Sequence, residues 1–228
     1  MHAPIRNLLT ATLAGLVLAA PAAHATTVIN FEGAALTGLY LPGDTQTAGS
    51  YVLTTLRDYG IVDTISGLGA LAPAGNASQF YFNSNDGALR ITATDNVPFG
   101  LDNFDVAFVP LDPPSPQTTV IVARGTTAAG ATVQAFWQFA PAVNSIFPFS
   151  SIAVGALLPG NLTQLDFFAC SLVGGVACGQ ATQNNGQFAI DNIRISPVPE
   201  PGAAWLLAAG LAGLAWRRLH ARASRTQA

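Results

Sequence analysis

Leu101-Asp102-Asn103-Phe104-Asp105-Val106-Ala107-Phe108-Val109 is a segment in which apolar and polar side chains alternate. Side chains of a β-strand point alternately to its two faces. Phe104, Val106 and Phe108 therefore share one face, opposite to Asn103 and Asp105. This alternation predicts a strand that lays one face on a hydrophobic core. The proline-rich segment 110–116 that follows cannot pair in a sheet, and we expect it to be a surface loop.

Short segments of the same kind recur along the chain between turn residues. Residues 83–87 read Asn-Ser-Asn-Asp-Gly and predict a hairpin between strands 79–82 and 88–92. A second hairpin is expected around residues 125–130, whereas the Gly-, Ala- and Pro-rich residues 61–75 predict a long connection. Many short strands without a convincing helix predict an all-β fold, an antiparallel β-sandwich. The remaining strands are expected at 27–31, 50–56, 118–124, 131–139, 146–154, 162–170 and 187–196.

The N-terminus has the three parts of a secretory signal peptide. Arg6 supplies a positive first region, residues 8–20 are apolar, and Ala23 and Ala25 form a small-x-small cleavage site. We expect signal peptidase to cut after Ala25; an uncleaved anchor is the alternative. Residues 1–25 would then leave a body of residues 26–197, which is long enough for one domain with a real core.

The composition of this body excludes several classes of function. It holds four arginines and eleven acidic residues, a formal charge of −7, which would repel nucleic-acid phosphates. It contains no histidine and no lysine, so Ser-His-Asp and Cys-His catalysis and histidine-bound zinc are excluded unless a partner supplies the residue. The spacing of the acidic residues along the sequence does not bring any two of them together as a catalytic pair. We therefore expect a protein that is not an enzyme, with a carboxylate-only glycoside hydrolase or lyase as the remaining catalytic alternative.

The C-terminal region predicts a membrane anchor. Residues 203–216 carry no charge, and Trp205 and Trp216 bracket them as interfacial tryptophans do. Arg217 and Arg218 begin an arginine-rich tail, 217–228, which predicts a cytoplasmic end and an exported body. Fourteen helical residues span about 21 Å, which is short for a hydrocarbon core of about 30 Å. A transmembrane helix of marginal length is the prediction, and a buried helix of a globular domain is the alternative.

A short motif precedes this segment. The motif consists of Val198, Pro199, Glu200, Pro201 and Gly202. Together with the apolar segment and the arginines that follow, it resembles the PEP-CTERM sorting signal of Gram-negative bacteria. The resemblance implies that residues 198–228 are read by exosortase, a membrane transpeptidase thought to cut near Pro-Glu-Pro. It also implies an inner-membrane anchor until processing and a cell-surface or extracellular location afterwards.

The body has a looser resemblance of its own. Four segments resemble the jelly-roll body of PEP-CTERM proteins: the opening Phe31-Glu32, segment 101–105, hairpin 120–133 and the closing segment 188–195. That body is in turn similar to the sandwiches of carbohydrate-binding modules. The resemblance implies that the first and last strands lie side by side, with a structural calcium ion between Glu32 and Asp191. The alternative is that Asp191 only makes turn or edge hydrogen bonds.

Two further features suggest sites. Cys170 and Cys178 are the only cysteines, and in an exported chain they predict a disulfide, with reduced thiols as the alternative. Trp137, the single tryptophan of the body, could stack on a sugar ring or fill the core.

The leading functional hypothesis is a non-catalytic exported surface or extracellular-matrix protein. The alternative is a carbohydrate-binding module that contacts extracellular polysaccharide.

Overall fold

The computed structural model describes most of the body of the chain. The described residues are 26–33, 35–68, 73–109, 119–144, 146–173, 177–178, 186–198 and 210–213. Residues Ala25–Val198 form one compact unit. Of the predicted anchor only residues 210–213 are described, and they are helical. Among the described residues no helix has the length and apolar character needed to span a membrane, and the rest of segment 203–216 lies outside them.

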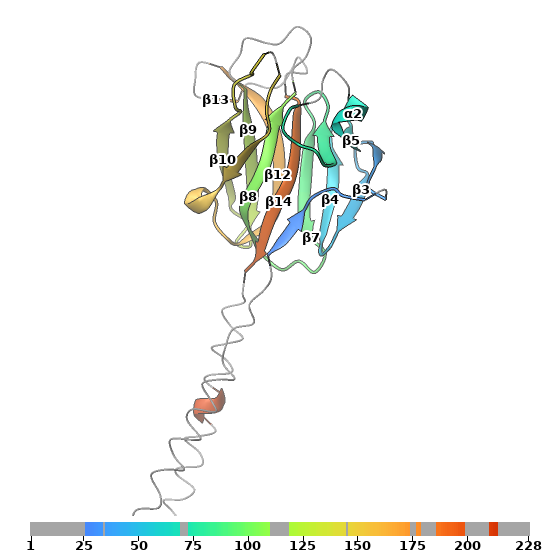
Figure 1. The fold of residues 1–228 in the computed structure, drawn as a ribbon. Coiled ribbons are helices and arrows are strands. Elements are labelled where there is room, and N and C mark those ends of the chain that lie inside the picture. Colours follow the sequence, from blue (N-terminus) through green and yellow to red (C-terminus); the bar gives the residue numbers. More distant parts are fainter. Residues whose placement is uncertain are drawn as a thin grey trace, which may run out of the picture. The chain divides into compact units, whose positions relative to one another are not determined.

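The compact unit is an antiparallel β-sandwich, so the predicted fold class is confirmed for the body (Figure 1). One layer, here called sheet 1, has the strand order β10-β9-β12-β7-β4-β3. Its central strand β12 pairs with β9 along one side and with β7 along the other. The strands of sheet 1 are β3 (Thr45–Ala48), β4 (Tyr51–Leu56), β7 (Ala88–Ala93), β9 (Thr119–Thr127), β10 (Thr132–Gln138) and β12 (Leu162–Val173), to which β13 (Ala177–Cys178) adds a short partner.

The second layer, sheet 2, has the strand order β11-β8-β14-β6-β5-β2. Its central strand β14 pairs with β8 along one side, whereas β6 and β1 share the other side. A single pair, Leu162 with Phe99, joins the two sheets. The strands of sheet 2 are β1 (Thr27–Ile29), β2 (Gly38–Tyr40), β5 (Gly60–Asp63), β6 (Phe80–Asn83), β8 (Phe99–Phe108), β11 (Ser150–Ala153) and β14 (Phe188–Pro197).

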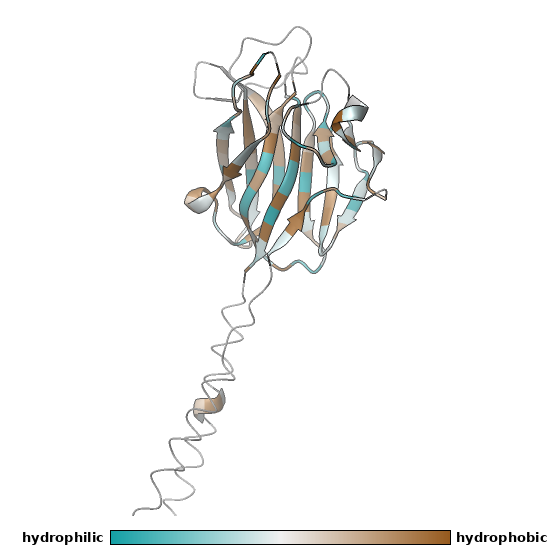
Figure 2. Ribbon diagram, viewed as in Figure 1, coloured by the Kyte–Doolittle hydropathy of each residue, from teal (hydrophilic) through white to brown (hydrophobic). Residues whose placement is uncertain are grey.

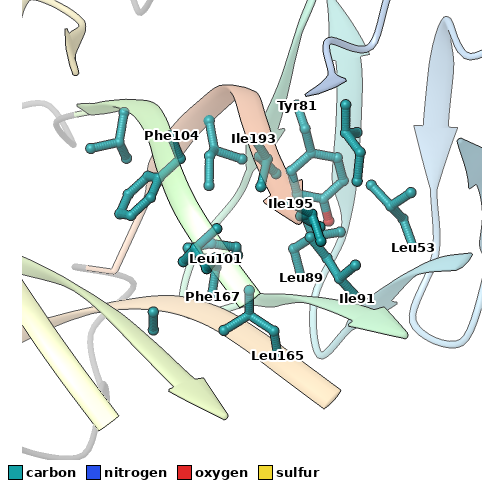
Figure 3. Close-up of a cluster of buried hydrophobic side chains, with 14 of the residues drawn as sticks. Leu53, Tyr81, Leu89, Ile91, Leu101, Phe104, Leu165, Phe167, Ile193 and Ile195 are labelled. Carbon is teal, nitrogen blue, oxygen red and sulfur yellow. The ribbon is translucent and has the colours of Figure 1, made fainter. Parts of the chain in front are cut away.

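The inner faces of the two sheets meet in one hydrophobic core. Leu53, Leu89 and Phe167 of sheet 1 face Phe104 and Ile193 of sheet 2 in Figure 3. Polar positions interrupt the apolar ones along β8 and β14, as the alternation in 101–109 predicts (Figure 2). Burial of these apolar side chains is the main term that stabilises the sandwich, at about 25 cal/mol per Å².

Tyr81 brings a hydroxyl into this core. The hydroxyl lies 3.1 Å from Thr55 Oγ1 and accepts a hydrogen bond from Asn83 Nδ2 at 3.1 Å. Burial raises the pKa of Tyr81 to about 12, so the phenol stays neutral over the range in which proteins fold. The small polar group of three residues is therefore hydrogen-bonded within the apolar layer, as a buried hydroxyl requires.

A smaller apolar cluster lies on the outer face of sheet 2. Phe80, Phe82 and Ala189 are buried there, and Phe149 packs on Phe80 with ring centroids 5.3 Å apart. Ile65 of the short helix α2 (Ile65–Leu68) covers the same cluster. The outer face of sheet 2 is thus partly covered by connecting segments.

Some sequence expectations are wrong. The predicted hairpin between 79–82 and 88–92 does not form, because β6 pairs with β5 and β14 of sheet 2 while β7 pairs with β4 and β12 of sheet 1. Residues 84–87, Ser-Asn-Asp-Gly, therefore carry the chain between the sheets. The connection predicted at 61–75 begins inside strand β5 and contains α2. The hairpin of β9 and β10 is confirmed.

Candidate functional site

Asp191 is a buried carboxylate on the outer face of sheet 2. Its Oδ2 accepts hydrogen bonds from Asn76 Nδ2 at 2.7 Å and from Ser78 Oγ at 3.0 Å, and its Oδ1 accepts one from the Asn192 amide at 2.7 Å. The side chain is 0% exposed. Burial raises the pKa of Asp191. The three hydrogen bonds lower the pKa and so oppose this rise, whereas the nearby charge of Asp105 adds to it. Three hydrogen-bond donors thus hold the Asp191 carboxylate beside the segment that contains Asn76.

A bulge in β14 shapes this cluster. Asn192 has φ of +48°, and the register between β14 and β8 shifts after the pair Asp191–Asp105. The turned Asn192 side chain donates to Asp105 Oδ2 at 2.8 Å, and Ser151 Oγ of the neighbouring strand β11 also donates to Asp105. Phe31, at the end of β1, has φ of +52° as well. The chain therefore leaves regular strand geometry at Asn192 within β14 and at Phe31 just after β1, a cost that the surrounding contacts must offset.

The first and last strands lie side by side, as the resemblance implies. Ile29 of β1 pairs with Ile193 of β14. Glu32 and Asp191 contact the same segment, because the Gln79 amide donates to Glu32 Oε1 at 3.2 Å, one residue after Ser78. Calcium takes carboxylate, amide and main-chain oxygens, and these residue types fit it. Both oxygens of Asp191 are nevertheless engaged by protein donors, and the described residues contain no group of three or more acidic, histidine or cysteine side chains that could hold a metal.

Trp137 and Phe136 lie on opposite faces of β10. Trp137 is directed inward, and its ring packs edge-on against Phe104 with centroids 5.4 Å apart. Phe136 is directed outward and is 61% exposed. This placement supports the core-filling alternative for Trp137. The aromatic side chain offered to solvent is its neighbour, which the sequence analysis did not select.

Phe136 belongs to a set of outward side chains on sheet 1 that we call the outer platform. Cross-strand pairing sets its rows, because Gln134 lies opposite Arg124, Arg124 opposite Asp166, and Asp166 opposite Arg90. The next row holds Phe136, Val122 and Phe168. The outer platform consists of Arg90, Arg124, Gln134, Phe136, Asp166 and Phe168.

Two arginines of the outer platform have different partners. Arg90 forms a two-point ion pair with Asp166, with Nε–Oδ1 at 2.8 Å and Nη2–Oδ2 at 2.9 Å, and the pKa of Arg90 is raised by this pairing. Gln164 Nε2 also donates to Asp166, at 3.1 Å. Arg124 instead lies over the Phe168 ring, 4.8 Å from its centroid. Its side chain is exposed and forms no ion pair with a described residue.

The two cysteines lie on adjoining strands. Cys170 is buried on β12, and β13 returns antiparallel so that Leu172 pairs with Cys178. The backbone pairing thus brings Cys178 back beside the strand that carries Cys170. The disulfide itself stays a prediction.

The sorting residues begin where the sandwich ends. β14 ends at Pro197, and the Val198 amide donates to the Pro98 carbonyl at 3.0 Å. Pro199, Glu200, Pro201 and Gly202 lie outside the described residues, as do the predicted cleavage residues Ala23 and Ala25. The anchor residues Trp205, Trp216, Arg217 and Arg218 lie outside them as well.

Comparison with known proteins identifies one part of the chain and its fold. Residues 197–219 match the family described as the PEP-CTERM protein-sorting motif, so the chain carries this motif. No curated protein matches the sequence. A DUF4465 family protein from Bacteroides caccae is similar in structure, with TM-score 0.50 and 13% identity over 76% of this chain and 100% of that chain. This similarity agrees with the fold.

Two more distant structures are also similar to the chain. A DUF4465 family protein from Bacteroides ovatus has TM-score 0.44 and 10% identity over 75% of this chain and 98% of its own. SGBP-B from a complex xyloglucan utilization locus in Bacteroides uniformis has TM-score 0.36 and 13% identity over 75% of this chain and 49% of its own.

Proposed function

We propose that this chain is an exported, non-catalytic protein that an exosortase-like membrane enzyme sorts to the cell surface or into an extracellular matrix. The observation that carries the proposal is the PEP-CTERM match at residues 197–219, which begins at the last residue of β14. The arrangement places the motif directly after the folded unit. A processing enzyme can therefore act on residues 199–202, which follow the last residue of the compact unit.

The remaining parts of the proposal concern the two chain ends. Signal peptidase removes residues 1–25, and segment 203–216 holds the protein in the inner membrane until it is processed. What supports this is the order of charged and apolar residues in the sequence. The absence of histidine and lysine from residues 26–197 supports a body without catalytic activity.

The intact mass of the protein from its native host tests the sorting proposal. A species that starts at Thr26 and ends between Pro199 and Gly202 is the expected result. Pro201→Ala should retain the C-terminal segment, whereas Pro159→Ala, an exposed proline of the body, should be processed like the wild type. A wild-type species that keeps Arg225 would contradict processing and indicate a permanent anchor.

A disulfide between Cys170 and Cys178 forms part of the proposed exported state. The antiparallel pairing of β12 and β13 supports it. The mass under non-reducing conditions should be about 2 Da lower than after reduction, because two thiol hydrogens are lost. Closing so small a loop should contribute about 2–3 kcal/mol to stability in the chain-entropy account. Two alkylated thiols in the unreduced protein would contradict it.

Glycan binding by the body is the second candidate function. The observation that favours it is the outer platform, where an exposed Phe136 lies beside polar side chains on a sheet face. An aromatic ring next to hydrogen-bonding groups can contact the apolar face of a sugar while the polar groups meet its hydroxyls. Retention of the protein on immobilised polysaccharides would support this function, and no retention on any would contradict it.

A further inference from the structure

The charges of the body are divided unequally between the two sheets. The strands of sheet 1 contain two arginines, Arg90 and Arg124, and one acid, Asp166, which gives +1. The strands of sheet 2 contain one arginine and four acids, which gives −3. Residues 26–197 as a whole carry four arginines and eleven acids. The outer platform is therefore a positively charged area of an acidic protein.

Within the outer platform the free charge is that of Arg124. Asp166 lies directly opposite Arg124 in the register, yet its oxygens are engaged by Arg90 and Gln164. The guanidinium of Arg124 lies instead on the Phe168 ring. A guanidinium that rests on an aromatic ring is held in place and keeps its hydrogen-bond donors for a carboxylate, which it can bind at two points.

The exposed ring of Phe136 lies on β10, the strand next to the one that carries Arg124. Phe136 pairs with Val122, two residues from Arg124 on the same face of β9. Diagonal neighbours of this kind lie about 7–8 Å apart, within reach of one ligand. Gln134, two residues before Phe136 and directly opposite Arg124, adds an exposed amide to the same face. The outer faces of β9 and β10 therefore present an apolar ring, an amide and a cation that has no ion pair with a described residue.

We propose that the outer platform binds an acidic polysaccharide, with Arg124 taking the carboxylate of a uronic acid residue and Phe136 contacting its sugar ring. This proposal rests on glycan binding, the second candidate function, and specifies its ligand. A uronic acid residue joins a carboxylate to a rigid ring that has an apolar face, which matches the two neighbouring groups. An acidic polypeptide offers carboxylates on flexible chains without such a ring, and it is the competing class.

Charge complementarity makes the ligand class specific. Exposed charges separated by more than about 8–10 Å are largely screened at physiological salt. The distant acids of the body therefore weaken binding of a polyanion less than the adjacent Arg124 strengthens it. A neutral polysaccharide would leave the Arg124 guanidinium without a partner. Its binding would not be strengthened by the positive charge of the outer platform.

The test uses the protein expressed from the complete 228-residue sequence and purified in detergent, with binding followed by calorimetry. The probes are polygalacturonate, its fully methyl-esterified form and polyglutamate. Polygalacturonate should bind at least tenfold more tightly than the ester, and sodium chloride should weaken its binding. Arg124→Gln should weaken it at least tenfold and Phe136→Ala several-fold. Arg194→Gln, an exposed arginine on sheet 2, is the matched control and should change it less than twofold.

The outcomes separate this inference from the function on which it rests. Binding of the ester as tightly as of polygalacturonate would overturn the acidic ligand and leave glycan binding standing. Equal binding of polyglutamate would overturn the sugar and favour an acidic polypeptide. No binding of polygalacturonate or its ester would overturn the inference, and retention on other polysaccharides would then decide glycan binding alone. Equal loss in Arg124→Gln and Arg194→Gln would overturn the location.

Discussion

Asp191 is the one fully buried charged side chain among the described residues of the sandwich. Its hydrogen bonds to Asn76, Ser78 and Asn192 stabilise the carboxylate, while burial disfavours its charge. Burial has the larger effect, so the pKa lies above the ordinary value of 3.8. The residue thus links stability to pH.

The direction of this link can be measured with Asp191→Asn in urea unfolding experiments with EDTA present. Because the pKa is higher in the folded state, the carboxyl contributes most to stability below pH 3.8, and this contribution declines as the pH rises through the folded-state pKa. The variant should lose about 1–3 kcal/mol through lost acceptors. This loss should be larger at pH 3.5 than at pH 7. A loss that grows toward pH 7 would contradict a raised pKa.

At the scale of elements, β10 carries a packed aromatic side chain and an exposed one at two consecutive residues. Trp137 packs on Phe104 inside the sandwich, and Phe136 is exposed outside it. The strand pairs only with β9 among the described strands, so it is an edge strand of sheet 1. The same element can therefore be tested for both roles.

Alanine substitutions at these two positions should have opposite consequences. Trp137→Ala leaves a cavity beside Phe104 and should lower the free energy of unfolding by about 2–4 kcal/mol. Phe136→Ala should change it by less than about 0.5 kcal/mol, because the ring is largely in solvent. Thermal or urea unfolding measures both. Equal destabilisation would mean that Phe136 is packed in solution.

Sequence reasoning was reliable where the pattern is local. The alternation of 101–109 gave strand β8, and the segments around 125–130 gave the β9–β10 hairpin. It failed at 83–87, because Asn-Gly-rich turns have the same composition whether the chain folds back or crosses to the other sheet. The outer platform was out of reach, because the contact of Arg124 with Phe168 depends on a register between residues 44 positions apart.

At the scale of the whole molecule, the two ends of the folded body lie together. Thr27 pairs with Ile195, and Thr26 Oγ1 lies 3.3 Å from Ser196 Oγ. The predicted signal-peptidase site directly precedes Thr26, and the PEP-CTERM motif directly follows β14. Thr26, which precedes the first strand, and Ser196, near the end of the last strand, therefore lie next to each other.

Calcium between the first and last strands would reinforce the joining of these ends. At a calcium concentration one hundred times its Kd, binding would stabilise the folded state by about 2.7 kcal/mol. EDTA should then lower the Tm of the wild type by roughly 5–10 °C. Glu32→Gln and Asp191→Asn should remove this response, and Asp95→Asn, an exposed turn residue, should keep it. A wild-type Tm that is the same with calcium and with EDTA would contradict the site.

The central position of β14 has a mechanical consequence. Consider a protein that is tethered through residue 198 and bound to a matrix through sheet 1. A pulling force would then enter the sandwich at the end of β14 in sheet 2 and pass through the core to sheet 1. β14 is hydrogen-bonded to β8 on one side and to β6 and β1 on the other. Extracting it means breaking both ladders together, whereas an edge strand would peel away one bond at a time. The proposed tether is thus joined to a strand that is hydrogen-bonded on both sides.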